Sequence, residues 1–538
     1  MKYAVQNCVT EWSFASAKAS GDVELSVEVT GPDGGALLVP AFWAGEGTWR
    51  VRFASPPVGR HRWRTVCSGT DLDGLDGEIE VAPYEGGNPL LRHGPLRVSE
   101  SRRHLEHLDG TPFFWLADTW WMGLCKRLGW PGDFQRLAAD RVAKGFSVVQ
   151  IVAGLYPDMP AFDERGANEA GFPWEPGYTR IRPDYFDMAD LRIAWLVEAG
   201  LVPCIVGCWG YFLPWMGIER MKRHWRNLVA RWGAYPVVWC LAGEGSMPYY
   251  LSEQKERDRE FQKQGWTELG AYVRSIDPYR RPVTIHPNDA ARNTVADPGV
   301  LDFDMLQTGH GDRRSLPNTV RLVTEAYGRE PRMPVLNGEV CYEGIGEASR
   351  QEVQRLMFWA SFLSGACGHT YGANGIWQVN TRERPFGPSP HGMSWGNTPW
   401  EEAYQLPGSG QLGLAKRLLE RYPWWRLEPA PESVEPHATK EDPFQPYAAG
   451  GVPRAGERSG EVRVIYLPNT AWRVTVKGLE AGAAWRASLF NPTNGAEEDL
   501  GPARPLASSR CPDAGGSWRM PLERPPIYQD WVLVLAGR

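Results

Sequence analysis

The chain has 538 residues, of which 42% are hydrophobic and 23% charged, a composition typical of a globular protein with about two to four domains. Its net charge of -6 and pI near 6.0 give no electrostatic reason to expect nucleic acid or an anionic membrane as a partner, since such binding needs a concentrated basic surface. Nine cysteines without metal-ligand spacing favour buried free thiols, and no apolar run has the length of a signal peptide or a membrane span, so we expect a cytoplasmic protein.

The first 85 residues have the pattern of short antiparallel strands. Val23–Val29 alternates apolar and polar residues, and Trp49–Phe53 and Gly59–Arg64 repeat this alternation after turn-forming segments. Such strands, separated by proline- and glycine-containing turns, are typical of a β-sandwich. A cluster of turn residues at Gly86–Pro89 then predicts a boundary, so we expect an N-terminal sandwich domain over residues 1–85.

Residues 86–428 alternate short apolar runs with amphipathic helical segments. The apolar runs are Phe113–Ala117, Ser147–Ile151, Leu201–Val206, Val237–Leu241, Pro282–Ile285, Phe303–Gln307, Val335–Asn337 and Gly368–Tyr371. Eight strands, each followed by a helix, predict a (β/α)8 TIM barrel. A doubly wound open sheet is the alternative, but a glycine-rich phosphate loop follows none of these runs.

The remaining residues, 429–538, return to strand-like patterns. Val462–Leu467, Trp472–Val476 and Asp530–Leu535 each have the length and the β-branched or aromatic content of a strand. We therefore expect a C-terminal β-sandwich that packs against the barrel.

Two glutamates follow directly on predicted strands of the barrel. Glu244 ends the segment of the fourth strand and Glu339 that of the seventh, and the carboxyl ends of all strands face the active-site side of a TIM barrel. Cleavage of a glycosidic bond needs one acidic group and one carboxylate, which a retaining enzyme places about 5 Å apart. We assign Glu244 as acid/base and Glu339 as nucleophile. Glu343 is the rival nucleophile, and Glu339 is preferred because a strand end holds a side chain more rigidly than a loop.

Other polar and aromatic residues near the strand ends are candidates for binding a sugar. Flat aromatic side chains stack on sugar rings, and this chain contains 26 tryptophans. The predicted substrate-binding residues are Asp118, Trp120, Trp121, Trp209, His286, Gln307, His310, Tyr342, Glu343, His369, Tyr371 and Trp377. An N-cap role is the alternative for Asp118. A zinc site lacks the required ligand spacing, and a serine hydrolase lacks its Gly-x-Ser-x-Gly turn.

The segment Asp109–Trp121 resembles the opening of the apiosidase-like glycoside hydrolase domain, also called domain of unknown function 4038 and related to glycoside hydrolase family 140. Gln307–His310 and Gly338–Glu343 are similar to later strand ends of that family. The N-terminal region is similar to the β-sandwich called domain of unknown function 5060, and the C-terminal region to the β-domain that often follows the barrel. One departure is Glu244, since members of the family can carry aspartate at this position.

This resemblance implies a retaining, exo-acting glycosidase, and from the missing ligand spacing we expect no metal or other cofactor. Glu244 and Glu339 occupy the positions of its acid/base and nucleophile. The substrate would be a small carbohydrate or glycoside, with a furanoside such as apiose as one candidate for the released sugar. The alternative is a non-catalytic carbohydrate-binding scaffold, and a homo-oligomer remains possible. A lyase or isomerase is disfavoured, because lysine is absent from the predicted strand ends.

Overall fold

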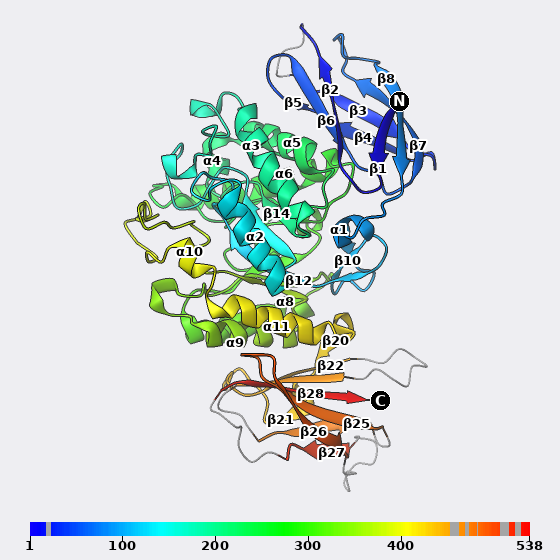
Figure 1. Cartoon of the computed structure of the whole chain (residues 1–538). Coiled ribbons are helices and arrows are strands. Elements are labelled where there is room, and N and C mark those ends of the chain that lie inside the picture. Colours follow the sequence, from blue (N-terminus) through cyan, green and yellow to red (C-terminus); the bar gives the residue numbers. More distant parts are fainter. Residues whose placement is uncertain are drawn as a thin grey trace.

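The structure is a computed structural model that describes residues 1–17, 23–451, 462–468, 473–480, 483–505, 516–521 and 529–537. Three parts follow one another along the molecule: an N-terminal pair of sheets that are antiparallel except for the parallel pairing of β1 with β8, a central parallel barrel wrapped by helices, and a C-terminal pair of antiparallel sheets (Figure 1). The predicted fold class, a TIM-like barrel with flanking β-regions, is confirmed.

The N-terminal sheets enclose a core of their own. A five-stranded sheet in the order β1-β8-β7-β3-β4 faces a three-stranded sheet in the order β2-β6-β5. Alternate residues of the strands, such as Trp12, Val27, Val51 and Ile79, point inward and are buried, as period-two patterning requires. The strands are β1 Lys2–Val5, β2 Thr10–Ala15, β3 Ser26–Thr30, β4 Ala36–Pro40, β5 Phe42–Trp43, β6 Thr48–Phe53, β7 Gly59–Val66 and β8 Asp76–Ala82.

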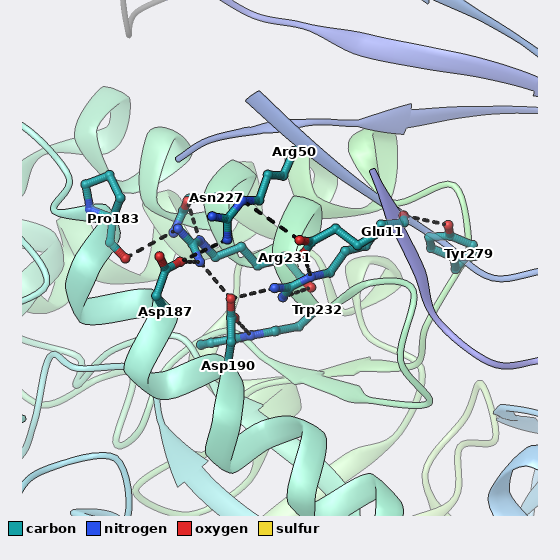
Figure 2. A network of polar contacts seen from close by, with 10 residues as sticks. Glu11, Arg50, Pro183, Asp187, Asp190, Asn227, Arg231, Trp232 and Tyr279 are labelled. Atoms are coloured by element: carbon teal, nitrogen blue, oxygen red, sulfur yellow. Dashed lines mark hydrogen bonds and ion pairs between the residues drawn. The ribbon is translucent and has the colours of Figure 1, made fainter. Parts of the chain in front are cut away.

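A buried ionic network joins this sandwich to the barrel (Figure 2). Arg52 on β6 donates to Asp190 at 2.6 Å, to Glu11 at 2.8 Å and to the carbonyl of Arg231 at 2.9 Å. Asp190 also accepts from Arg231 at 2.8 Å and from the indole of Trp232 at 2.7 Å. Because a buried charge is costly unless it is paired and hydrogen-bonded, these contacts fix the sandwich against the barrel helices.

Eight parallel strands form the barrel in sequence order. All eight predicted strands are present, and β16 and β17 are the two edges of the sheet, connected by a 2.8 Å hydrogen bond from the amide of Asp302 to the carbonyl of Val283. The strands are β12 Trp115–Trp120, β13 Val148–Val152, β14 Val202–Val206, β15 Val238–Cys240, β16 Val283–Thr284, β17 Asp304–Gln307, β18 Val335–Glu339 and β19 Gly368–Tyr371.

The first barrel strand begins and ends later than the sequence predicted. The apolar run Phe113–Ala117 is divided between two sheets, because Phe113 belongs to β11, which pairs with β10 in a small antiparallel sheet. Strand β12 begins at Trp115 and extends to Trp120, so that Asp118 lies within the strand rather than after it. The small sheet consists of β9 Leu96–Val98, β10 Leu105–His107 and β11 Pro112–Phe113.

Helices surround the barrel and bury its outer face. Nearly all residues of helix α9, Gln351–Leu363, are buried because it lies between the barrel and the C-terminal sheets. The helices are α1 Pro89–Arg92, α2 Gly132–Lys144, α3 Pro183–Glu198, α4 Phe212–Met216, α5 Ile218–Trp232, α6 Lys255–Ile276, α7 Ala291–Thr294, α8 Leu316–Gly328, α9, α10 Trp400–Ala403 and α11 Pro407–Leu419. Within the described ranges, none of them combines the length and hydropathy needed to cross a membrane.

The C-terminal region contains a six-stranded and a three-stranded antiparallel sheet. One face of the larger sheet, with Tyr466 and Val534, joins the barrel core, and its other face builds a separate core with Ile465 and Leu533. The strands are β20 Leu427–Pro429, β21 Val434–Glu435, β22 Tyr447–Gly451, β23 Val462–Leu467, β24 Thr475–Leu479, β25 Trp485–Phe490, β26 Glu497–Ala503, β27 Gly516–Arg519 and β28 Trp531–Gly537. Trp472, in one predicted strand, lies outside the described residues.

The cysteines in the described part of the chain carry free thiols. Cys204, Cys208, Cys240 and Cys367 are all buried, as the sequence predicted. Burial raises the pKa of the Cys367 thiol to about 12, which keeps it protonated at neutral pH. The ninth cysteine, Cys511, lies outside the described residues.

Candidate active site

Two carboxylates meet at the carboxyl end of the barrel, bridged by one amide. Gln307, the last residue of β17, donates from its side-chain nitrogen to Glu244 Oε1 at 3.1 Å and to Glu339 Oε1 at 3.0 Å. Because one nitrogen contacts both oxygens, these two oxygens lie at most about 6 Å apart, close to the spacing of a retaining pair of carboxylates. Glu339 ends β18, and Glu244 follows β15 by four residues.

Glu339 is surrounded by groups that favour its ionised form. His310 Nε2 lies 2.8 Å from Oε1, and His286 Nε2 lies 3.1 Å from Oε2 without the alignment of a hydrogen bond. Burial by itself would raise the pKa of Glu339, but the neighbouring ring of His286 and the hydrogen bond from His310 outweigh burial and hold that pKa well below its usual range. The same contact with Glu339 raises the pKa of His310 against the effect of burial.

Glu244 has the opposite electrostatic environment. Burial and the nearby negative charge of Glu339 raise the pKa of the Glu244 carboxyl. Its backbone is left-handed, with φ of 41°, and its amide donates to His286 Nδ1 at 3.4 Å. A left-handed conformation at a residue other than glycine costs roughly 1–3 kcal/mol and concentrates at functional sites. The two glutamates therefore favour different protonation states, as an acid and a nucleophile must.

Aromatic rings line the same end of the barrel. The indole of Trp121 donates to the hydroxyl of Tyr342 at 2.9 Å and packs edge-on against Trp209 and His286. The ring of Tyr342 stacks between His310 and Trp377, with centroids 4.9 and 5.9 Å away.

Two glycines allow these rings to approach the backbone. A Cβ atom on Gly243 would lie 2.2 Å from the ring of Trp209, and one on Gly372 would lie 2.1 Å from the ring of Tyr342. Any larger residue at either position would displace a ring of the site.

Two predicted substrate-binding residues on β12 lie away from this cluster. The carboxylate of Asp118 is fully buried on the outside of the barrel, where it accepts from Arg141 at 2.6 Å and from the indole of Trp120 at 2.8 Å. Trp120 packs edge-on against Phe134 of α2. Because residues two apart on a strand share a face, both side chains point toward the helices, and their position argues against contact with a substrate. Asp118 is not a helix N-cap either.

Three further predicted residues also lie outside the cluster. His369 is buried against Phe358 of α9, because alternate residues of β19 point outward. Tyr371, two residues later, donates to Glu343 Oε2 at 2.5 Å. Glu343 also accepts from the amide of Gly408 at 3.1 Å. The carboxylate of Glu343 is thus hydrogen-bonded to residues outside the cluster, and its position argues against the rival role of nucleophile.

Asp158 is an acidic residue at this end of the barrel that was not among the predicted site residues. Asp158, which follows β13, is buried and has a left-handed backbone with φ of 57°. Its carboxylate accepts from Tyr250 and, at 3.1 Å, from the indole of Trp395. Its place shortly after a predicted strand was the available signal, but its hydrogen-bond partners are distant in sequence and could not be predicted. Among the described residues, His, Cys, Asp and Glu side chains form no group of three or more suited to hold a metal ion.

Three solved structures with a similar fold are described as glycoside hydrolases. A structure described as a glycoside hydrolase has 22% identity and a TM-score of 0.66 over 84% of this chain and 98% of its own. A family 5 glycoside hydrolase from Bacteroides vulgatus has the same identity and TM-score over 84% of this chain and 94% of its own. A putative glycoside hydrolase from the same organism has 16% identity and a TM-score of 0.71, with both chains fully covered. At these identities the similarity concerns the fold.

Family comparisons address the sequence itself. Residues 7–68 match the domain of unknown function DUF5060, in agreement with the resemblance of the N-terminal sandwich. No curated protein sequence matches the chain. Residues 99–426 match the apiosidase-like catalytic domain. This match spans more than half of the chain and all eight barrel strands, so the protein belongs to the apiosidase-like family and is a glycoside hydrolase.

Proposed function

We propose that the protein is a retaining, exo-acting glycosidase with Glu244 as acid/base and Glu339 as nucleophile. The observation that carries this proposal is the single amide of Gln307 that contacts both carboxylates. Carboxylates this close match the spacing of about 5 Å in retaining enzymes, whereas inverting enzymes hold them about 6.5–9.5 Å apart. The raised pKa of Glu244 and the lowered pKa of Glu339 support the division of roles.

The proposed reaction has two steps at the anomeric carbon. In the first, Glu339 attacks this carbon while Glu244 transfers its proton to the glycosidic oxygen, so that the aglycone leaves as an alcohol and a glycosyl ester forms on Glu339. In the second, the ionised Glu244 takes a proton from water, and the resulting hydroxyl group attacks the same carbon. The ester bond to Glu339 breaks, and both glutamates regain their starting protonation states.

His286, His310 and Gln307 hold the nucleophile ionised and oriented in this scheme. All three contact the carboxylate of Glu339 at 2.8–3.1 Å. Preorganised polar groups of this kind lower the reorganisation needed in the transition state. Their contacts also keep Glu339 from turning away from the anomeric carbon.

The proposed substrate class is a glycoside with a small terminal sugar, for which apiose, a furanose, is the leading candidate. Most side chains around the carboxylates, including Trp121, Trp209 and Tyr342, are at most 5% exposed, which suits one enclosed sugar better than a polymer running through the site. The match to the apiosidase-like catalytic domain supports apiose as the sugar. We place the chemistry in a barrel domain over residues 86–428, between β-domains over 1–85 and 429–538.

A pair of matched variants tests the assignment. Glu339→Gln removes the proposed nucleophile, whereas Glu343→Gln changes the neighbouring glutamate, which hydrogen-bonds Tyr371 outside the cluster. We expect Glu339→Gln to lose activity by at least about 10⁴-fold on apiosides and other aryl furanosides and pyranosides, because removal of a catalytic nucleophile commonly costs that much. Glu343→Gln should retain turnover. Product anomers followed by NMR should show net retention.

Two results would contradict this function. Wild-type activity in folded Glu339→Gln protein would remove Glu339 from the mechanism. Formation of the inverted anomer by the wild-type protein would exclude a covalent glycosyl intermediate on Glu339 and reassign it to a general base.

A further inference from the structure

One buried carboxylate ties together three loops at the carboxyl end of the barrel. Asp158 belongs to the loop after β13, Tyr250 to the loop after β15, and Trp395 to the long loop between β19 and α10. Tyr250 donates its hydroxyl to Oδ1 of Asp158, and Trp395 donates its indole N–H to Oδ2 at 3.1 Å. Both oxygens of this carboxylate are thus engaged by aromatic side chains far apart in sequence.

The three loops form a surface that we name the aromatic wall, consisting of Tyr249, Tyr250, His391 and Trp395. Its rings are in continuous contact: Tyr250 lies 5.9 Å from Tyr249 and 4.6 Å from His391, and His391 lies 6.2 Å from Trp395, between ring centroids. A 2.7 Å hydrogen bond from Asn374 to the carbonyl of Trp395 holds the far end. The wall is therefore a fixed part of the fold.

The aromatic wall is linked to the backbone segment of Glu244 through Gly210 and Tyr211. Tyr211 packs against Tyr249, with centroids 5.3 Å apart, and its chain neighbour Gly210 donates to the carbonyl of Gly243 at 2.7 Å. A Cβ atom on Gly210 would lie 2.3 Å from the carbonyl oxygen of Glu244. Since the acid/base protonates the leaving oxygen, the neighbouring surface receives the leaving group.

The chemistry of this surface favours an apolar, flat ligand. The polar tips of Tyr250 and Trp395 are both directed to Asp158, so these residues offer ring surface rather than free hydrogen-bond donors. Two of the strongly exposed large hydrophobic residues of the protein flank the wall: Leu251 is 62% exposed and Met393 is 53% exposed. These side chains add apolar surface to the loops that carry the aromatic rings.

We propose that the aromatic wall is the aglycone site and that it selects glycosides whose leaving group carries an aromatic ring. The proposal rests on the function assigned to Glu244 above. It concerns the aglycone of the substrate, whereas the apiosidase-like match concerns only the sugar. Tyr250 and Trp395 bind the ring of the aglycone, and Asp158 positions both of them. A leaving group that is a second sugar would find few free donors on this surface and should be a poorer substrate.

Ligand-observed NMR with benzyl alcohol tests the wall without turnover. We expect saturation transfer from the protein to the ring protons of benzyl alcohol, and about tenfold weaker binding in Trp395→Ala and Tyr250→Ala, the scale of losing one aromatic contact with its buried area. Trp43→Ala is the matched control, a partly exposed tryptophan of the N-terminal sandwich. Equal binding by all four proteins, or absence of binding to the wild-type protein, would overturn the inference even if the enzyme is an active glycosidase.

Kinetics on matched glycosides give the second test. Benzyl and methyl glycosides of the same sugar release alcohols of similar acidity, so their ratio of kcat/KM reports contact with the ring rather than leaving-group reactivity. We expect the wild-type protein to prefer the benzyl glycoside over both the methyl glycoside and the corresponding disaccharide, and Trp395→Ala to reduce the benzyl-to-methyl ratio about tenfold. An unchanged ratio in Trp395→Ala, or preference for the disaccharide, would refute the aglycone assignment. If the wild-type protein cleaves none of these glycosides, the failure belongs to the proposed function, and the NMR result still decides whether the wall binds an aromatic ring.

Discussion

The junction between the N-terminal sandwich and the barrel offers a quantitative test, because β6 carries two arginines in very different environments. The side chain of Arg52 is 7% exposed and that of Arg50 is 34% exposed. Arg52 makes the short contacts to Asp190, Glu11 and the carbonyl of Arg231 described above (Figure 2). Arg50 reaches its acidic neighbours only at 3.9 Å.

We predict that Arg52→Ala destabilises the protein by about 3–5 kcal/mol, the usual effect of removing one partner from a buried charge network. Asp190 would keep Arg231 and Trp232 as partners, so we expect the lower half of this range. Arg50→Ala should cost at most about 1 kcal/mol, since exposed ion pairs contribute little. The same strand thus supplies both the perturbation and its control.

Calorimetry can measure the difference in stability between the two variants. Because a chain of several domains need not unfold in one step, the unfolding transitions of the sandwich and the barrel must be resolved from each other. Peptide mapping after limited proteolysis adds spatial information. In Arg52→Ala, cleavage within residues 1–85 should become faster at temperatures where the barrel is still resistant. Equal destabilisation by the two substitutions would refute the argument that burial and pairing at Arg52 fix the sandwich in place.

Two further predictions concern Glu244. Because the pKa of Glu244 is raised in the folded protein, its ionisation lowers the stability of the fold as pH rises above the ordinary value of 4.5. At neutral pH, Glu244→Gln should therefore melt at a higher temperature than the wild-type protein, and the difference should vanish below pH 4.5. A lower melting temperature of the variant at neutral pH would contradict this prediction. The charge of Asp158 also contributes to the raised pKa of Glu244, after burial and Glu339. In Asp158→Asn, which tolerates the same left-handed backbone, the alkaline limb of the kcat/KM profile should move to lower pH, whereas a shift to higher pH would exclude this coupling.

Much of the fold could be predicted from local pattern. The eight barrel strands are short apolar runs bounded by turns, and burial on both faces makes such runs recognisable without knowledge of their partners. The positions of Glu244 and Glu339 followed from counting these runs. The bounds of the first strand were less predictable, because Phe113 and Trp115 look alike in sequence but belong to different sheets.

Side-chain direction was the part that local pattern could not supply. A shift of one residue along a strand exchanges its inner and outer faces, so the sequence could not decide that Asp118 and His369 point toward helices. Contacts distant in sequence were equally hidden. The amide that holds Glu343 comes from Gly408, and the indole that holds Asp158 comes from Trp395, 237 positions away.

The left-handed backbone of Glu244 has a consequence for inactivation by heat. The strain of this conformation, roughly 1–3 kcal/mol, is relieved when the segment around Glu244 unfolds locally. The barrel core has no comparable strain to relieve on local unfolding. This segment, with the hydrogen bonds of Glu244 and Gly245 to His286, should be among the first parts of the barrel to depart from its native geometry on warming. Catalytic half-life and global melting would then report different events, and a variant with a rigid core need not be a more durable catalyst.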